Sequence, residues 1–135
     1  MQGVFSNLYI ISVETHFKAS HQLLLACGTK ESEHSHDWKV SAQVCSSKLS
    51  EGICMDFNKL KAELDYIVSE FDNISLNNTE AFNEHNPSAE MIAKYIYEQL
   101  EPSLPKGIKL NHVEVAEQSC YRAKYMPDSI IEPEK

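Results

Sequence analysis

Apolar and polar residues alternate along two stretches in the first third of the chain. Between Leu8 and His21, one parity carries Val13, Thr15, Phe17, Ala19 and His21. Successive side chains of a strand point to opposite faces, so this parity predicts a strand with one buried face. A second alternation, at Trp38, Val40, Ala42 and Val44, predicts another strand.

The middle of the chain changes to the spacing of three and four residues that is typical of amphipathic helices. One predicted helix runs from about Phe57 to Glu70 and follows Asp56, a residue type that caps helices. Its expected apolar positions are Phe57, Leu60, Leu64, Ile67, Val68 and Phe71. A second predicted helix opens at Pro87-Ser88 and ends before Pro102. Residues 72–86, between the helices, lack sustained periodicity, which predicts a loop with at most a turn of helix.

Alternation returns at residues 108–116, and a short last strand is expected at Tyr121–Met126. The predicted order is therefore β-β-α-α-β-β, which is an α+β fold. The chain has 135 residues, of which 42% are hydrophobic and 24% charged. This size and composition predict a single domain over residues 1–135, built around one core.

The formal net charge of −8 argues against sequence-independent binding to nucleic acid or to anionic membranes, because both need clustered lysine and arginine. Small molecules and other proteins are the expected partners. The four cysteines include no C-x-x-C pair and are expected to be reduced thiols. The apolar run at residues 8–11 is soon broken by Glu14 and His16, which predicts neither a signal peptide nor a membrane span. We therefore expect a cytoplasmic protein.

Two histidines stand just before the second predicted strand. His34 and His36 have the parity of Trp38, so both imidazoles lie on the buried face if the strand extends back to them, about 7 Å apart along the chain. His21 ends the apolar face of the first strand and is the candidate third ligand, whereas His16 has the opposite parity. Three imidazoles with an open fourth position are typical of catalytic zinc. A solvated histidine pair in a glutamate-rich loop is the alternative interpretation.

Five motifs in order carry a resemblance to a known family. They are Phe17-Lys-Ala-Ser-His21, His34-Ser-His36, Met55-Asp-Phe-Asn-Lys-Leu-Lys61, Asn86-Pro-Ser-Ala-Glu90 and Val113-Glu-Val-Ala-Glu117. Together they resemble the 6-pyruvoyl-tetrahydropterin synthase family, which includes the bacterial 6-carboxytetrahydropterin synthases that supply the queuosine precursor pathway.

The resemblance implies the tunnelling fold, in which a four-stranded antiparallel sheet carries two helices packed on one face. It also implies a homohexamer of two stacked trimers, with sites at the interfaces between protomers. His21, His34 and His36 would hold Zn²⁺, and 7,8-dihydroneopterin triphosphate would be the substrate. Glu117 would accept hydrogen bonds from the pterin ring. Ser88 falls at a position whose hydroxyl contacts the pterin in relatives, although its alternative role is to cap the second helix.

The sequence departs from the family at the residues that should move protons. Cys27 stands seven positions before His34, farther than in relatives, and Glu31 aligns with the glutamate of relatives that use a carboxylate base. Either residue could be the base. Asp72 is followed by Asn73 where relatives have aspartate and histidine, and asparagine cannot relay a proton near neutral pH.

Three functions are therefore compared. The first is a zinc-dependent lyase that forms 6-carboxy-5,6,7,8-tetrahydropterin with loss of triphosphate. The second cleaves the same substrate to 6-hydroxymethyl-7,8-dihydropterin for folate synthesis, with Glu31 as the base. The third is a non-catalytic pterin or purine binder, because Asn73 replaces the relay histidine. His85 or His112 could take over the relay, Asp72 could act alone as a catalytic residue, or the pterin chemistry could be altered or slow. We expect a structural hydrogen bond for His112 and simple exposure for His85.

Overall fold

The computed structural model of the chain describes residues 7–128, so residues 1–6 and 129–135 of the expected domain lie outside the described residues. The described part contains one sheet with the strand order β3-β1-β2-β4-β5. Its strands are β1 (Tyr9–His21), β2 (His34–Ser46), β3 (Ile74–Ser75), β4 (Lys109–Gln118) and β5 (Tyr121–Tyr125). Each of the four longer strands is antiparallel to its neighbour, as predicted.

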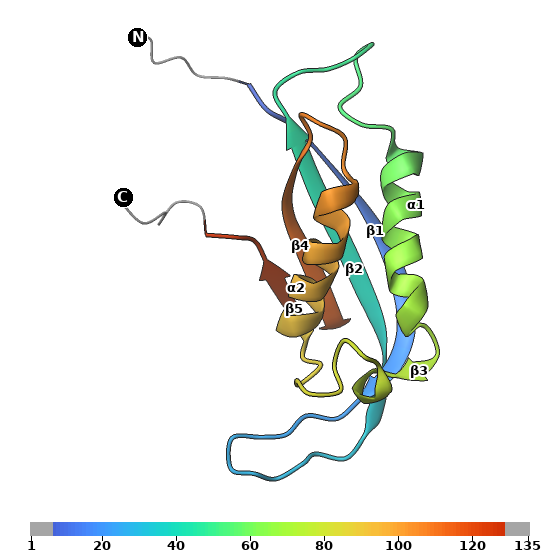
Figure 1. The fold of residues 1–135 in the computed structure, drawn as a ribbon, viewed down its shortest axis with the longest axis vertical. Coiled ribbons are helices and arrows are strands. Elements are labelled where there is room, and N and C mark those ends of the chain that lie inside the picture. The colour runs from blue at the N-terminus through green and yellow to red at the C-terminus, as the bar shows by residue number, and fades with distance from the viewer. Residues whose placement is uncertain (1–6, 129–135) are drawn as a thin grey trace.

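The hairpin of β1 and β2 decides where the histidines lie. Its register runs without a shift from Tyr9 opposite Ser46 to His21 opposite His34. β2 therefore extends back to the histidine pair. This was the condition for both imidazoles to lie on the buried face. The loop between these strands, residues 22–33, projects past the end of the sheet (Figure 1).

Two helices lie over one face of the sheet (Figure 1). They are α1 (Phe57–Val68) and α2 (Ala89–Leu100), and short 3₁₀ turns follow at Ser69–Phe71, Leu76–Asn78 and Glu101–Ser103. The side chain of Asp56 caps α1 by accepting a hydrogen bond from the amide of Asn58, and that of Ser88 caps α2 by accepting one from Met91. Caps of this kind satisfy amides that have no partner within the helix.

The core lies between the helices and the apolar face of the sheet. Its largest fully buried side chains include Trp38, Phe71, Leu60, Leu64, Leu76, Ile92, Ile96 and Leu100. The predicted strand parity is confirmed, since Phe17, Ala19 and Trp38 are all buried. On α2, Ala93 and Tyr97 are buried together with Ile92 and Ile96, whereas Gln99 is exposed. The core thus supports the strand ends that carry the histidines.

Three expectations were wrong in detail. The sheet has five strands rather than four, because the two-residue β3 pairs in parallel with β1 at Ala19 and Ser20. The first helix ends at Val68 rather than Glu70, since the chain tightens there into a 3₁₀ turn. Phe57 begins that helix but is 58% exposed, although it has the helical spacing of the buried Leu60 and Leu64.

Among residues 7–128, no helix has the length and apolar character needed to cross a membrane.

Candidate metal centre

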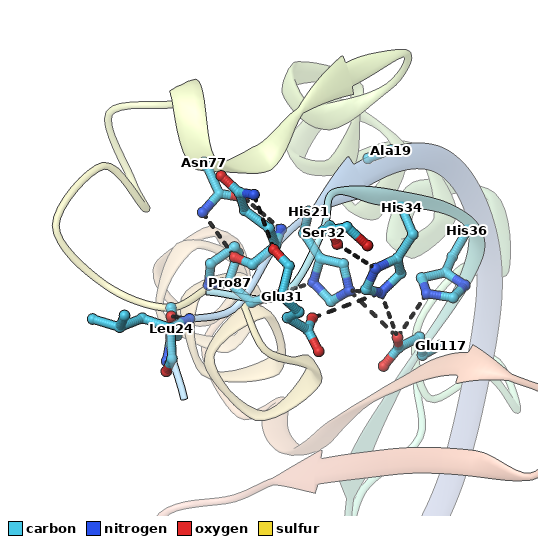
Figure 2. Close-up of polar contacts among 12 residues, drawn as sticks. Ala19, His21, Leu24, Glu31, Ser32, His34, His36, Asn77, Pro87 and Glu117 are labelled. Atoms are coloured by element: carbon cyan, nitrogen blue, oxygen red, sulfur yellow. Dashed lines mark hydrogen bonds and ion pairs between the residues drawn. The ribbon is translucent and has the colours of Figure 1, made fainter. Parts of the chain in front are cut away.

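Four side chains from three strands converge at one end of the sheet (Figure 2). His21 ends β1, His34 and His36 begin β2, and Glu117 comes from the end of β4. One ligand atom from each side chain lies within 4.8 Å of every other. The structure therefore brings together the three histidines predicted from sequence and adds a carboxylate to them.

Two backbone carbonyls determine which nitrogen of each imidazole faces the centre. Nδ1 of His21 lies 2.8 Å from the oxygen of Pro87, and Nδ1 of His34 lies 3.0 Å from the oxygen of Ser32. A carbonyl oxygen only accepts, so both Nδ1 atoms carry the proton and donate it. In the neutral rings, both Nε2 atoms are then bare acceptors that point inward. Metal-binding histidines are held in this way by their second nitrogen.

The inward-facing nitrogen and oxygen atoms lie closer together than hydrogen-bond acceptors do when no cation lies between them. Nε2 of His21 lies 3.0 Å from Nε2 of His34 and 3.3 Å from Oε2 of Glu117. Nε2 of His36 lies 2.7 Å from the same carboxylate oxygen, and it is buried without a hydrogen-bond partner among the described residues. An ionised carboxylate and an unprotonated ring nitrogen both only accept. A divalent cation among these atoms removes the repulsion, so the residues fit a bound metal.

Burial favours the neutral, metal-binding form of His36. Loss of solvation lowers the pKa of this imidazole below its ordinary value, the carboxylate of Glu117 raises it, and His34 and His21 lower it further. His21 is also almost fully buried, at 1% exposure, and its ring packs edge-on against Trp38 with 4.9 Å between ring centres. The indole of Trp38 is in turn fixed by donating a hydrogen bond to the oxygen of Ala19. The site therefore has a rigid apolar floor.

Of the two candidate bases, Glu31 lies nearer to the histidines. Its Oε1 is 3.9 Å from Nε2 of His34, and this oxygen is buried without a hydrogen-bond partner. Cys27 is exposed at the turn of the loop over residues 22–33, and neither it nor Glu31 is one of the four convergent side chains. A hydrogen bond with the side chain of Thr29 lowers the pKa of its thiol. The loop therefore presents a carboxylate toward the centre and a thiol toward solvent.

The other predicted site residues lie outside the convergent group. Oδ1 of Asp72 accepts a hydrogen bond from the amide of Lys18 on the edge of β1, and Asn73 follows with a left-handed φ of 65°. Asparagine and histidine both tolerate this conformation, so the backbone does not explain the choice of asparagine. The hydroxyl of Ser88 accepts from the amide of Met91, which is the capping role. His85 is exposed, as expected.

The expectation for His112 was wrong. Its side chain is buried, yet its Nδ1 has no hydrogen-bond partner among the described residues. The polar contact at this point of the sheet is made instead by Asn111, whose amide donates to Oε1 of Gln43 at 2.6 Å. The register between β2 and β4 shifts between Gln43 and Val44, beside Asn111 and His112 of β4.

Two asparagines that the sequence interpretation did not single out hold the segment after His21. Asn77 pairs with the backbone N–H and C=O of Gln22, and Asn86 pairs with those of Leu24, all at 2.8–2.9 Å. Each amide side chain makes the two backbone hydrogen bonds that a neighbouring strand would make, and Figure 2 shows those of Asn77. Their only sequence signal was an asparagine-rich loop.

Comparison with known proteins agrees with this geometry. The sequence matches the 6-pyruvoyl tetrahydropterin synthase family over residues 10–128. The chain belongs to this family. It is 34% identical over 124 residues to the 6-carboxy-5,6,7,8-tetrahydropterin synthase of Synechocystis, covering 87% of this chain and 93% of the relative. It is also 32% identical over 102 residues to the dihydroneopterin monophosphate aldolase of Pyrococcus furiosus, covering 75% of this chain and 86% of that protein.

A solved structure confirms the tunnelling fold. The 6-pyruvoyl tetrahydropterin synthase of Caenorhabditis elegans superposes with a TM-score of 0.78 at 20% identity, covering 93% of this chain and all of that one. The family acts on pterins, so this chain has a pterin-processing role within it. Its His-His-His-Glu group could hold a metal ion.

Proposed function

We propose that this protein is a zinc-dependent lyase that converts 7,8-dihydroneopterin triphosphate to 6-carboxy-5,6,7,8-tetrahydropterin with loss of triphosphate. The observation that carries the proposal is the convergence of three imidazoles and a carboxylate, all acceptors, within 4.8 Å at the end of the sheet. The Synechocystis relative, 34% identical, bears the name of this activity.

Bound zinc would act as a Lewis acid that makes the hydroxyls and neighbouring C–H bonds of the substrate side chain more acidic. The protein itself supplies position and a proton acceptor. Pro87 and Ser32 orient two imidazoles through their carbonyl oxygens, and Trp38 excludes water from beneath them. Glu31 has an unpaired buried oxygen 3.9 Å from Nε2 of His34, where it can take a proton from the substrate.

A second candidate is cleavage of the pterin side chain to 6-hydroxymethyl-7,8-dihydropterin. The position of Glu31, nearer to the histidines than the exposed Cys27, favours this reaction. The name of the Pyrococcus relative, an aldolase of dihydroneopterin monophosphate, also supports it. Both candidates use the same metal centre. The cleavage uses Glu31 as its base, whereas in the lyase either Glu31 or Cys27 can be the base.

One assay separates the functions. The zinc-loaded protein is incubated with 7,8-dihydroneopterin triphosphate, and the pterin product is identified by its mass. A 6-carboxytetrahydropterin product supports the first proposal, and a 6-hydroxymethyl product replaces it with the second. Binding without any product would make the chain a non-catalytic pterin binder, and activity gained by Asn73→His would attribute that state to the missing relay.

Matched variants then identify the base. Glu31→Gln keeps the shape of the side chain but removes the carboxylate, and Cys27→Ala removes the thiol. Only the variant that lacks the base should lose turnover, by about 10²-fold or more. Loss in Cys27→Ala alone would show that the loop over residues 22–33 moves its thiol toward the metal.

We also propose that the protein assembles into a trimer or hexamer in the cytoplasm. Within residues 7–128, the outer edge of β5 and that of the first half of β1 have no strand partner, and ring closure between copies would satisfy both edges. All four cysteines are free thiols, which suits a reducing compartment. Sedimentation analysis of the purified protein tests the assembly.

A further inference from the structure

The carboxylate of Glu117 lies inside the histidine cluster rather than beside it. Its Oε2 is 2.7 Å from Nε2 of His36, 3.3 Å from that of His21 and 3.7 Å from that of His34 (Figure 2). The strand pairing is irregular around Glu117. The register between β4 and β5 shifts between Ala116 and Gln118, and the pairing of β2 with β4 ends at Ala116. Such irregularities re-aim a side chain, and this one directs Glu117 at the histidines.

The distances match a fourth ligand better than a neighbour of the ligands. Four ligands at about 2.0–2.1 Å from a tetrahedral zinc ion lie about 3.3 Å from one another. The three oxygen-to-nitrogen distances, 2.7, 3.3 and 3.7 Å, lie on both sides of that value. The contact between Nε2 of His21 and Nε2 of His34, 3.0 Å, is close to it as well.

We infer that Glu117 is the fourth metal ligand of the substrate-free protein, and that the hydroxyls of a pterin side chain displace it. This inference rests on the metal centre of the proposed function. Among the four ligands Glu117 is suited to exchange, because its side chain is 26% exposed, whereas His21 and His36 are 1% and 14% exposed. His34 is 37% exposed, but the hydrogen bond from its Nδ1 to the oxygen of Ser32 fixes its ring. The released carboxylate would then be free to accept hydrogen bonds from the pterin ring.

Cobalt(II) tests the ligand set without any turnover, since its visible absorption depends on the number and type of ligands. Metal-free full-length protein is titrated with Co²⁺ and compared with Glu117→Gln, His36→Ala and the control Glu114→Gln, which changes a carboxylate three residues away on β4. The wild type and the control should show the same strong four-coordinate band. Glu117→Gln should change that band and weaken Co²⁺ binding by about 10-fold or more. Loss of a residue that only contacts a metal ligand already weakens metal binding by about 10-fold.

The outcomes separate the inference from the proposed function. If His36→Ala loses Co²⁺ binding but Glu117→Gln keeps the wild-type spectrum and affinity, Glu117 is not a ligand and the metal centre stands. If His36→Ala also binds Co²⁺ like the wild type, the metal centre itself is wrong. Circular dichroism of each variant shows that it has folded.

Displacement is tested by adding 7,8-dihydroneopterin, which carries the side chain without the triphosphate. In the wild type its binding should alter the Co²⁺ spectrum, because a carboxylate leaves the metal. In Glu117→Gln the change should be smaller. Saturating binding that leaves the wild-type spectrum unchanged would overturn the exchange.

Discussion

His112 shows what burial does to a single imidazole outside the metal centre. It is only 8% exposed, and its Nδ1 has no partner among the described residues. Loss of solvation lowers its pKa below the ordinary value, the nearby Lys124 lowers it further, and Glu114 raises it. The folded protein therefore holds this ring in its neutral form more firmly than the unfolded chain does.

His112 should make the protein less stable in mild acid. A proton binds the unfolded chain more readily, so the free energy of unfolding falls as pH drops below about 6.5, the ordinary histidine pKa, and levels off below the lower pKa of the folded state. At higher pH the ring contributes no pH dependence. Urea unfolding of wild type and His112→Gln between pH 7.5 and 5.0 measures this. The free energy of unfolding should fall less in His112→Gln than in the wild type as the pH is lowered. Parallel curves of unfolding free energy against pH would contradict the prediction.

Single residues also show where sequence interpretation stops. The parity of His34, His36 and His21 was enough to predict that they share one face, because an unbroken register keeps parity. The position of Glu117 depends on a register shift that no local pattern marks. The carbonyls of Pro87 and Ser32 orient the rings, and a backbone oxygen has no signal in the sequence.

Among the elements, the start of α2 combines two tasks. Ser88 caps the helix, and the carbonyl of the preceding Pro87 accepts the hydrogen bond that orients His21. A change that frays the first turn therefore also loosens His21, a candidate metal ligand.

Ser88→Ala should lower the free energy of unfolding by about 1 kcal/mol, because an amide of the first turn loses its acceptor. Ser88→Asn should keep most of the stability, since asparagine is an equally good cap. Urea denaturation of the two variants at pH 7.5 provides the measurement. Equal losses in both would mean that the hydroxyl does more than cap α2.

The second prediction at the level of elements concerns Asn77 and Asn86, the two asparagines that clamp the backbone after His21. Asn77→Ala and Asn86→Ala each remove two hydrogen bonds to the segment after His21, worth about 1 kcal/mol apiece. We expect faster hydrogen exchange at residues 22–31 with little change in β4. The control Asn83→Ala alters an exposed residue of the same loop. If the clamp variants exchange like this control, the asparagines do not hold the loop.

Most elements were predictable because their patterns are long. Thirteen-residue strands such as β1 and β2 repeat the alternation many times, and the helices carry both a stripe and a cap. The two-residue β3 has no period to detect. It forms because Asp72 and Asn73 bind the backbone of Lys18, a contact between residues far apart in the sequence.

For the whole molecule, a metal ion held by the four convergent side chains would act as a cross-link. His21, His34 with His36, and Glu117 belong to β1, β2 and β4, three adjacent strands of the sheet. An ion shared by them ties together the ends of these strands next to the projecting loop. Because the unfolded chain does not hold these groups together, binding of the ion stabilises the folded state.

Removal of the metal should therefore lower the melting temperature of the whole protein. Zinc at 100 times its dissociation constant stabilises the fold by about 2.7 kcal/mol, which amounts to several degrees in a domain of this size. Thermal unfolding with zinc and with excess chelator measures the shift in wild type, His36→Ala and His16→Ala. His16 is exposed, so His16→Ala should keep the full shift, whereas His36→Ala should lose most of it. An equal shift in all three proteins would mean that zinc binds elsewhere.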